Sequence, residues 1–345
     1  FKQKTAYEIM PSLVGSEMCI RDRAGYSCPD VRRKYREFFS RHADIYRGLV
    51  PHSDVGLVFS YDELAWGTRS HLENTYRVAE ELMARHVLFD VLVERSFVPE
   101  KLEKYKVIIA CDLKHLSAEQ TSWVEKYLEG GGALLVAGSF GAFDERGRPR
   151  RGDALDSFGN VRGLRRSGWI KEASVGQGRF VAVTDLKQIL SPKPFEMFMM
   201  SEDDSLDLGR IKELASSAKT AGGRKRALLE QLEGLAGRLA ISECEETLRF
   251  NAFRTLPQDG RMLTLHCVNY NVPILDRGKS GPPTPTEPAT VRLPLPSGWE
   301  VEAVELFNPP ESEARELDYK VDGDNAVLTL PPVGVYSVLK VACKF

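Results

Sequence analysis

Four short apolar runs in the first half of the chain constrain its fold more than any other feature. They are VGLVFS at 55–60, FDVLVE at 89–94, KVIIAC at 106–111 and ALLVAG at 133–138. Each run is rich in Val, Ile and Leu and lacks a clear alternation of polar and apolar residues. Such runs are typical of strands that are buried on both faces, as in a parallel sheet.

Helical patterns separate the first two runs and the last two, at 70–85 and 117–128. Each pattern begins with a capping box, in which a serine and the side chain three residues later cap the helix reciprocally. The two boxes are Ser70 with Glu73 and Ser117 with Gln120. Three glycines at 130–132 end the second helix, because glycine accepts the left-handed conformation. This alternation predicts an α/β fold with a doubly wound, mostly parallel sheet over residues 49–245.

The rest of this α/β region is less regular. Residues 140–166 are rich in Gly, Asp and Arg and include seven arginines. We interpret them as a long solvated loop, with an anion site as the alternative. A further strand is predicted at 178–186, and helices at 209–219 and 224–239. The last helix carries a leucine stripe that we expect to pack on the sheet. The stripe consists of Leu228, Leu232, Leu235 and Leu239.

The pattern changes near Glu246, where short β patterns separated by Gly, Pro and Asp turns replace the helices. The six patterns cover 248–256, 261–271, 289–296, 301–309, 325–332 and 335–343. Alternating residues at this spacing predict a small antiparallel β-sandwich over residues 246–345. The proline-rich segment 278–288 cannot pair inside a sheet, because proline lacks the N–H donor. We expect it to form a long hairpin loop.

The beginning of the chain does not resemble a folded segment. Residues 1–23 can be back-translated into two stretches that resemble oligonucleotides used as sequencing-library adapters, both in one reading frame. A signal peptide is disfavoured because no continuous apolar stretch is present. We interpret residues 1–23 as an artefactual leader and expect the coding sequence to continue upstream of Ala24. Residues 24–48 carry an amphipathic pattern and are expected to form a helix from a missing upstream domain, with no partner of its own in this chain.

Composition excludes several classes of function. The formal net charge is −2 over 345 residues, so the chain has no excess of basic residues that would indicate nucleic-acid binding. The sequence contains no run of 18 apolar residues, so it predicts no membrane-spanning helix and no membrane partner. The six cysteines are scattered and lack CxxC spacing, so we expect no zinc site, no disulfide framework and no cofactor. The compartment stays open.

Candidate ligand contacts follow the first apolar run. Ligands of open α/β sheets bind at the carboxyl ends of strands, where Tyr61, Asp62, Trp66 and Arg69 are expected to form a loop. The aromatic side chains could stack on a sugar, and the charged ones could bind its hydroxyls. The alternatives are a subunit contact and a packed loop with an exposed polar edge.

A second candidate is Ser139, which lies between glycines in the sequence GSFG, as in a nucleophile elbow. A serine nucleophile needs an oriented histidine base. The only histidine after it is His266, inside a predicted strand of the sandwich. We therefore expect a structural turn at Ser139 and no catalytic residue in this chain. Cys111 is expected to be a buried apolar cysteine.

Several of these segments together resemble a known family over about residues 30–345. They are VGLVFSYDELAWG, FDVLVE, the stretch from KVIIACDLKHL to GAFDERG, RMLTLHCVNY and LPLPSGWEVEAVELFNP. The α/β part resembles the trimerisation domain of bacterial β-galactosidases of the glycoside hydrolase type. That domain is similar to class I glutamine amidotransferase domains and lacks their activity. The resemblance implies a flavodoxin- or amidotransferase-like sheet, a catalytic barrel before it, a β-sandwich after it, and a homo-oligomer, in the family a trimer.

Two classes of function therefore compete. The first is a non-catalytic C-terminal fragment, with assembly and accessory domains, of a β-galactosidase-like glycoside hydrolase that acts on carbohydrate through the missing barrel. The alternative is a stand-alone amidotransferase-like hydrolase or a protein that binds a small ligand or carbohydrate. A suitably placed histidine after Ser139 would favour the alternative, and the sequence offers none.

Overall fold

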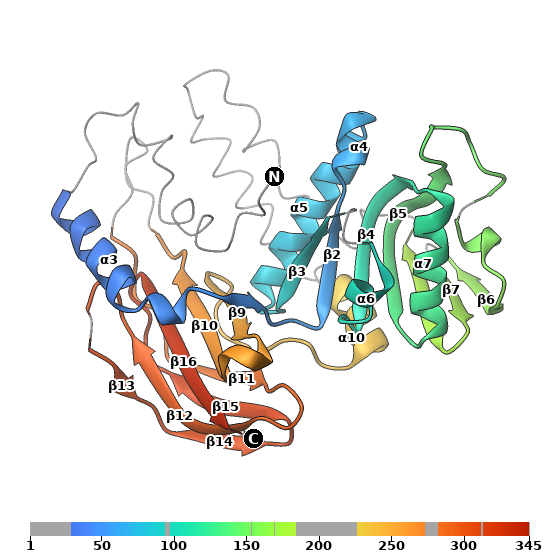
Figure 1. Cartoon of the computed structure of the whole chain (residues 1–345). Helices are drawn as coiled ribbons and strands as arrows, with labels where there is room; N and C mark the ends of the chain where they lie inside the picture. The colour runs from blue at the N-terminus through green and yellow to red at the C-terminus, as the bar shows by residue number, and fades with distance from the viewer. Residues whose placement is uncertain are drawn as a thin grey trace. The chain divides into compact units, whose positions relative to one another are not determined.

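The computed structural model describes residues 29–93, 97–152, 154–168, 170–183, 226–272, 282–311 and 313–344. These residues form two compact units (Figure 1). The α/β unit lies within residues 53–246, and the β unit combines residues 29–52, 247–272 and 283–344. The described part of the chain is rich in β-strands, which form one mixed sheet and two antiparallel sheets. None of the described helices is long and apolar enough to cross a membrane.

The α/β unit is built on a seven-stranded sheet in the order β3-β2-β4-β5-β8-β7-β6. Its strands are β2 (Val55–Phe59), β3 (Phe89–Val93), β4 (Val107–His115), β5 (Ala133–Phe143), β6 (Val161–Ser167), β7 (Ile170–Val175) and β8 (Gly178–Val183). The first five strands in this order are parallel, and β7 and β6 extend the sheet in antiparallel fashion. The four apolar runs therefore form neighbouring parallel strands, as predicted.

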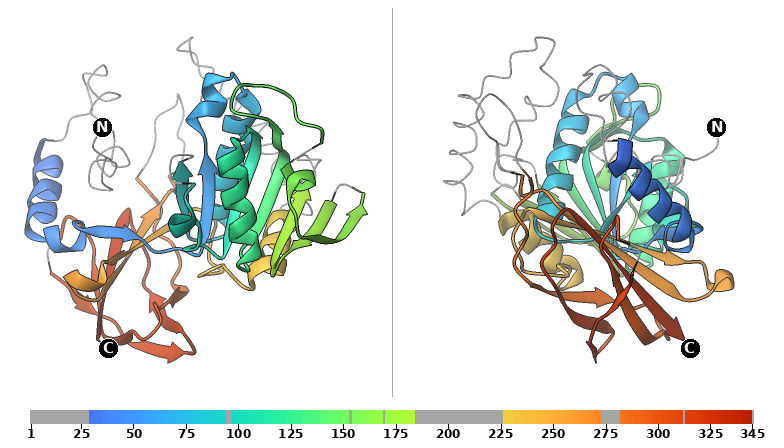
Figure 2. Two further views of the ribbon diagram at one scale, coloured as in Figure 1. Left: turned by 45° about the vertical axis from the view of Figure 1, so that its right-hand side comes forward. Right: turned by 90° about the vertical axis from the view of Figure 1, so that its left-hand side faces the viewer.

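Helices contact both faces of this sheet (Figure 2). On one face, α5 (Arg69–Ala84) and α10 (Arg226–Ala236) bury Val78, Leu82 and Leu232 against the strands. On the other face, α6 (Pro99–Leu102) and α7 (Ala118–Glu129) bury their own apolar residues. Successive strand residues thus enter opposite cores, which is why the runs show no polar alternation.

One predicted capping box is present and the other is not. Ser117 Oγ accepts a bond from the backbone N–H of Gln120, at 3.0 Å, and Gln120 Oε1 accepts one from the N–H of Ser117, at 2.8 Å. The prediction at Ser70 is wrong, because α5 begins one residue earlier, at Arg69. A short helix, α4 (Tyr61–Ala65), and the turn at Gly67, with φ of +75°, set this earlier start.

The arginine-rich segment 140–166 is not a loop throughout. It ends in β6, which the sequence reading missed because β6 is exposed and has no apolar pattern. The predicted helix at 209–219 and the side chain of Leu228 lie outside the described residues. The rest of the leucine stripe packs on the sheet as predicted, with Leu232 fully buried.

The β unit contains a six-stranded sheet, β1-β9-β10-β16-β12-β13, and a three-stranded sheet, β11-β15-β14. The strands are β1 (Leu49–Pro51), β9 (Leu248–Thr255), β10 (Met262–Asn269), β11 (Ala289–Pro294), β12 (Glu300–Phe307), β13 (Arg315–Glu316), β14 (Tyr319–Asp322), β15 (Asn325–Leu330) and β16 (Tyr336–Lys344). All six predicted β patterns form strands. The expected hairpin across 278–288 is not formed, because the flanking strands do not pair: β10 pairs with β9 and β16, and β11 pairs with β15 in the other sheet. Residues 278–281 of this segment lie outside the described residues.

The amphipathic helix expected to lack a partner has one. This helix, α3 (Pro29–Arg41), belongs to the β unit, where Phe38 and Tyr46 are buried against Phe307 and Tyr336. Tyr336 Oη lies 3.1 Å from Tyr46 Oη and 2.6 Å from His266 Nδ1. Burial lowers the pKa of His266 to about 3, so its imidazole stays neutral in this network. The proposed leader, residues 1–23, lies outside the described residues.

Candidate functional site

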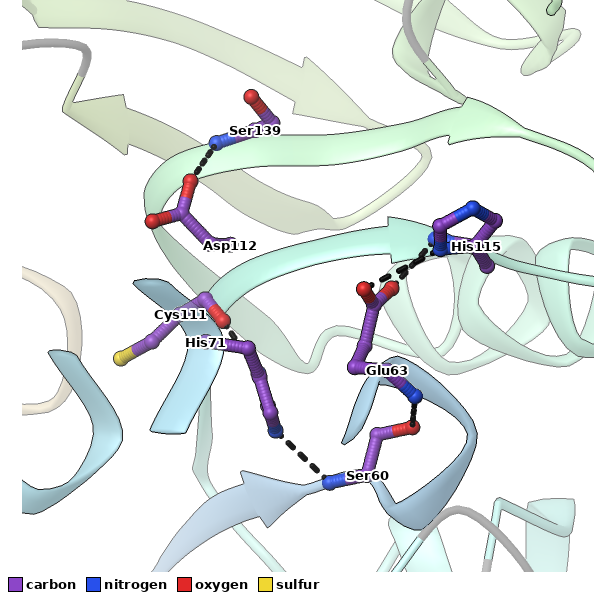
Figure 3. A network of polar contacts seen from close by, with 7 residues as sticks. All are labelled: Ser60, Glu63, His71, Cys111, Asp112, His115 and Ser139. Atoms are coloured by element: carbon purple, nitrogen blue, oxygen red, sulfur yellow. Dashed lines mark hydrogen bonds and ion pairs between the residues drawn. The ribbon is translucent and has the colours of Figure 1, made fainter. Parts of the chain in front are cut away.

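A network of polar side chains lies at the carboxyl ends of β2, β4 and β5 (Figure 3). These strands are parallel and β4 pairs with both of the others, so their carboxyl ends meet at one edge of the sheet. The residues drawn are Ser60, Glu63, His71, Cys111, Asp112, His115 and Ser139. All but His115 and Ser139 are buried. This is the edge at which open α/β sheets bind ligands.

His71 joins the residue that follows β2 to the middle of β4. The backbone N–H of Ser60 donates to Nε2 of His71 at 2.9 Å, so this nitrogen is the acceptor. The hydrogen therefore resides on Nδ1, which donates to the carbonyl oxygen of Cys111 at 2.6 Å. The ring is fully buried and both of its nitrogens bind backbone. His71 is thus a neutral structural link with no nitrogen left to act as a base.

Glu63 orients His115 across the same edge. Ser60 Oγ caps α4 by accepting a bond from the backbone N–H of Glu63, at 3.2 Å, which places Glu63 in the first turn. The carboxylate has no exposed surface. Its Oε1 accepts from the backbone N–H of His115 at 2.5 Å, and its Oε2 lies 3.1 Å from Nδ1 of the same residue. The buried carboxylate is therefore satisfied by a single partner residue.

Two aromatic rings enclose the His115 imidazole. Trp66 stacks on it with ring centroids 4.9 Å apart and an interplanar angle of 8°. Phe143 stacks at 5.2 Å and 21°. One face of the Trp66 indole is thus already covered, so a sugar could stack only on what remains exposed. The arrangement fixes the imidazole in place between its carboxylate and the two rings.

Asp112 ties β4 to the turn within β5. It lies at a register shift of β4 and has a φ of +43°. Its Oδ2 accepts from Nδ2 of Asn74 at 2.7 Å, and its Oδ1 accepts from the backbone N–H of Ser139 at 3.0 Å. A Cβ atom at Gly138 would lie 2.3 Å from Oδ1, and the φ of Gly138 is +93°. Glycine at this turn therefore makes room for the aspartate.

The four residues expected in a ligand loop lie outside this network. The loop is largely the helix α4, with Trp66 at its carboxyl end and Arg69 opening α5. Tyr61 and Trp66 are 61% and 50% exposed, and Asp62 is also exposed. The Arg69 side chain is 82% exposed and lies 4.0 Å from Glu73. Of the four, Trp66 contacts the network by stacking on His115.

Sequence spacing did not identify most members of the network. Glu63, His71, Asn74 and His115 were not candidates. One local signal was available, because Ser60 and Glu63 have the spacing of a helix amino terminus. The partner of Glu63 on β4 is His115, 52 residues later in the sequence, and could not be identified from spacing.

Ser139 has the geometry of a structural turn. Its side chain is exposed, and its hydroxyl makes no hydrogen bond to any residue that the structure describes. Figure 3 shows the hydroxyl pointing away from the imidazoles of His71 and His115. Burial, reinforced by the charge of Asp112, raises the pKa of the Cys111 thiol to about 12. Among the described residues, no three potential ligands gather as a metal site.

Replacing Ser139 with alanine should change neither activity nor stability measurably. Alanine keeps the backbone N–H that Asp112 accepts, so the free energy of unfolding should stay within about 0.5 kcal/mol. Ser139→Pro removes that donor and should cost about 1–3 kcal/mol. Glutaminase and esterase assays and urea unfolding of the three proteins test this. Activity that is present in the native chain and lost in Ser139→Ala would establish a catalytic serine.

No protein-family model matches this sequence, and no curated protein matches it either. Solved structures do share its fold. The α-L-fucosidase isoenzyme 2 from Paenibacillus thiaminolyticus aligns with a TM-score of 0.55 and 16% identity, over 90% of this chain and 51% of that one. The β-galactosidase from Bacillus circulans sp. alkalophilus aligns with a TM-score of 0.53 and 11% identity, over 87% and 43%. This chain thus spans about half the length of either enzyme, and the likeness concerns the fold alone.

Proposed function

We propose that this chain is a non-catalytic accessory and assembly part of a β-galactosidase-like glycoside hydrolase, whose chemistry resides in a barrel domain that precedes it. The observation that carries the proposal is the fold likeness, which extends over 87–90% of this chain and only 43–51% of each enzyme. Each of these hydrolases has further chain beyond the shared fold. The proposal places the sugar chemistry in that further part.

We also infer that the sheet is doubly wound in the flavodoxin or amidotransferase manner. Numbered along the chain, the parallel strands β3-β2-β4-β5-β8 have the order 2-1-3-4-5, which is the flavodoxin-like order. Helices on both faces support the same inference. This topology agrees with the resemblance to class I glutamine amidotransferase domains, whose activity the proposal does not assign here.

The two buried carboxylates at the sheet edge support a structural role. A retaining glycosidase needs two carboxyl groups about 5–5.5 Å apart, available to protonate and attack the glycosidic bond. In Glu63, both oxygens lie within bonding distance of His115. In Asp112, both oxygens accept bonds from Asn74 and Ser139. Neither carboxylate has an oxygen to spare, so the proposed catalytic pair is assigned to the preceding barrel.

We further propose that the α/β unit assembles into a homotrimer. Three aromatic side chains on α4 and α5 are half-exposed or more: Tyr61, Trp66 and Tyr76. Aromatic residues are enriched where protein surfaces associate, and a homo-oligomer uses closed symmetry. A carbohydrate that stacks on the same rings is the competing interpretation of this surface.

The full chain should be inactive on aryl β-galactosides and aryl α-L-fucosides, and should sediment with three times its mass of 38.6 kDa. Analytical ultracentrifugation of two variants tests whether the association is specific. Trp66→Ser changes the proposed contact surface and should weaken the trimer, and the control Leu164→Ser changes an exposed residue on β6 and should not. Turnover of either glycoside would overturn the non-catalytic assignment. A strict monomer at high concentration would overturn the assembly. A longer genomic read that shows no barrel-coding frame before Ala24 would contradict the proposed architecture.

A further inference from the structure

The antiparallel part of the α/β sheet carries a shallow pocket that the proposed function does not use. It has a volume of about 200 Å³ and is formed over β6, β7 and β8. Its polar lining comes from Arg165, Glu172, Ser174 and Arg179. A water molecule occupies about 30 Å³ of liquid, so the pocket has room for an ion or a sugar-sized ligand. We call it the arginine pocket.

A β-bulge in β6 brings its arginines to one face. Arg162 pairs with Ser174 and Arg165 pairs with Glu172, so two residues of β6 oppose one of β7 between these pairs. Gly163, with φ of +62°, provides the left-handed conformation that such a bulge requires. Without the bulge, residues three apart would face opposite sides of the strand. With it, Arg162 and Arg165 share the face of Ser174.

Arg179 is held in place from the other side of Ser174. It pairs with Ser174 in the sheet, and its guanidinium donates to the carbonyl oxygen of Gly234. That carbonyl belongs to the last turn of α10, where backbone acceptors lack helical partners and the helix dipole favours a positive charge. One donor of Arg179 is thus used as an anchor, and its other side-chain donors make no hydrogen bond to the residues that the structure describes.

Two arginines of this face have no partner among the residues that the structure describes. Neither Arg162 nor Arg165 has an ion-pair or hydrogen-bond partner within the described part of the chain. Glu172 is the one acidic residue among the pocket's lining side chains. The chain as a whole is slightly acidic, with a net charge of −2, so this basic face is a local exception.

We propose that the arginine pocket binds a singly charged oxyanion, a carboxylate or a sulfate ester, on a small hydroxylated ligand. Guanidinium groups bind such oxyanions through parallel hydrogen bonds. Arg165 and Arg179 supply them, and the hydroxyl of Ser174 donates between them. Glu172 accepts a hydroxyl of the ligand and repels a second negative charge, so a monoanion is preferred to a phosphate dianion. The site stands independently of the proposed glycoside hydrolase.

Calorimetric titration of the full chain at low ionic strength tests the site with four probes: glucuronate, glucose 6-sulfate, glucose 6-phosphate and glucose. Glucuronate or glucose 6-sulfate should bind, and whichever binds more tightly identifies the oxyanion. Glucose 6-phosphate should bind more weakly and glucose not at all. Added salt should weaken the binding, because exposed charges are screened. Absence of binding by both monoanions would overturn the proposal.

Paired variants test whether the ligand binds in the arginine pocket or is attracted by the general positive charge of the surface. Arg165→Gln should weaken binding about tenfold, the effect of one lost charged hydrogen bond. Arg166→Gln removes the same charge from the next residue, whose side chain lies on the opposite face, and should have little effect. Glu172→Gln should strengthen binding roughly twofold to fivefold by removing a like charge. Equal weakening by Arg165→Gln and Arg166→Gln, or weakening by Glu172→Gln, would refute the arginine pocket. Circular dichroism checks that each variant is folded.

Discussion

Replacing Glu63 with alanine is expected to lower the free energy of unfolding of the α/β unit by about 3 kcal/mol. The carboxylate is completely buried and accepts the backbone N–H of His115, with the second oxygen 3.1 Å from Nδ1. Alanine leaves that N–H without its acceptor in a buried site. The loss of the Glu63 side chain also opens a cavity below the stacked rings of Trp66 and His115.

Urea unfolding followed by circular dichroism measures this loss, with Asp62→Ala as the matched control. Asp62 is the preceding residue of the same helix and is exposed, so its truncation should change stability by no more than about 0.5 kcal/mol. Glu63→Gln keeps an oxygen acceptor for the backbone N–H and should cost less than half as much as Glu63→Ala. If Glu63→Ala and Asp62→Ala were equally stable, the carboxylate would not be holding β4 to α4.

The sequence predicted the parallel strands well, because their signal is local. Each run needs only consecutive apolar residues, and both cores form from alternate members of the same run, as Ile108 and Ile109 illustrate. β6 escaped prediction for the opposite reason. Its side chains are exposed and three of them are arginines, so nothing in its hydrophobicity distinguishes it from a solvated loop.

The expected ligand loop lies at the same edge of the sheet as the polar network, but most members of the network were not predicted. The rule that ligands gather at strand carboxyl ends depends only on topology, and it led to Tyr61 and Trp66, which are exposed. Glu63 and His115 are 52 residues apart in the sequence. A buried polar residue can be predicted only when its hydrogen-bond partner is known, and local sequence spacing does not identify a partner at that separation.

The same limit explains the error at α3. Its amphipathic pattern predicts a helix and an apolar face, which the structure confirms. The residue that bonds to Tyr46 is Tyr336, 290 positions later. Only the folded β unit shows that this face is covered by the chain's own carboxyl-terminal strands, so the prediction that it lacked a partner was wrong.

Gly178→Ala should lower the free energy of unfolding of the α/β unit by about 4 kcal/mol. A Cβ atom at this position would lie 2.1 Å from the carbonyl oxygen of Leu128 and 2.4 Å from that of Gly132. Both atoms are backbone, so no side-chain rotation can relieve the overlap. The end of α7 and the glycine turn after it would have to move away from β8, and Leu128 is part of the buried core.

Thermal unfolding tests this with Gly234→Ala as the control. Gly234 lies within α10 and has no neighbouring atom within 4 Å of the added methyl group, so alanine there should stabilise the helix by up to about 1 kcal/mol. The melting temperature should fall by roughly 10 °C in Gly178→Ala and stay equal or rise slightly in Gly234→Ala. The two substitutions are chemically identical, so their difference isolates the contact between β8 and the turn after α7. Equal melting temperatures would mean that this close backbone approach does not exist in the folded protein.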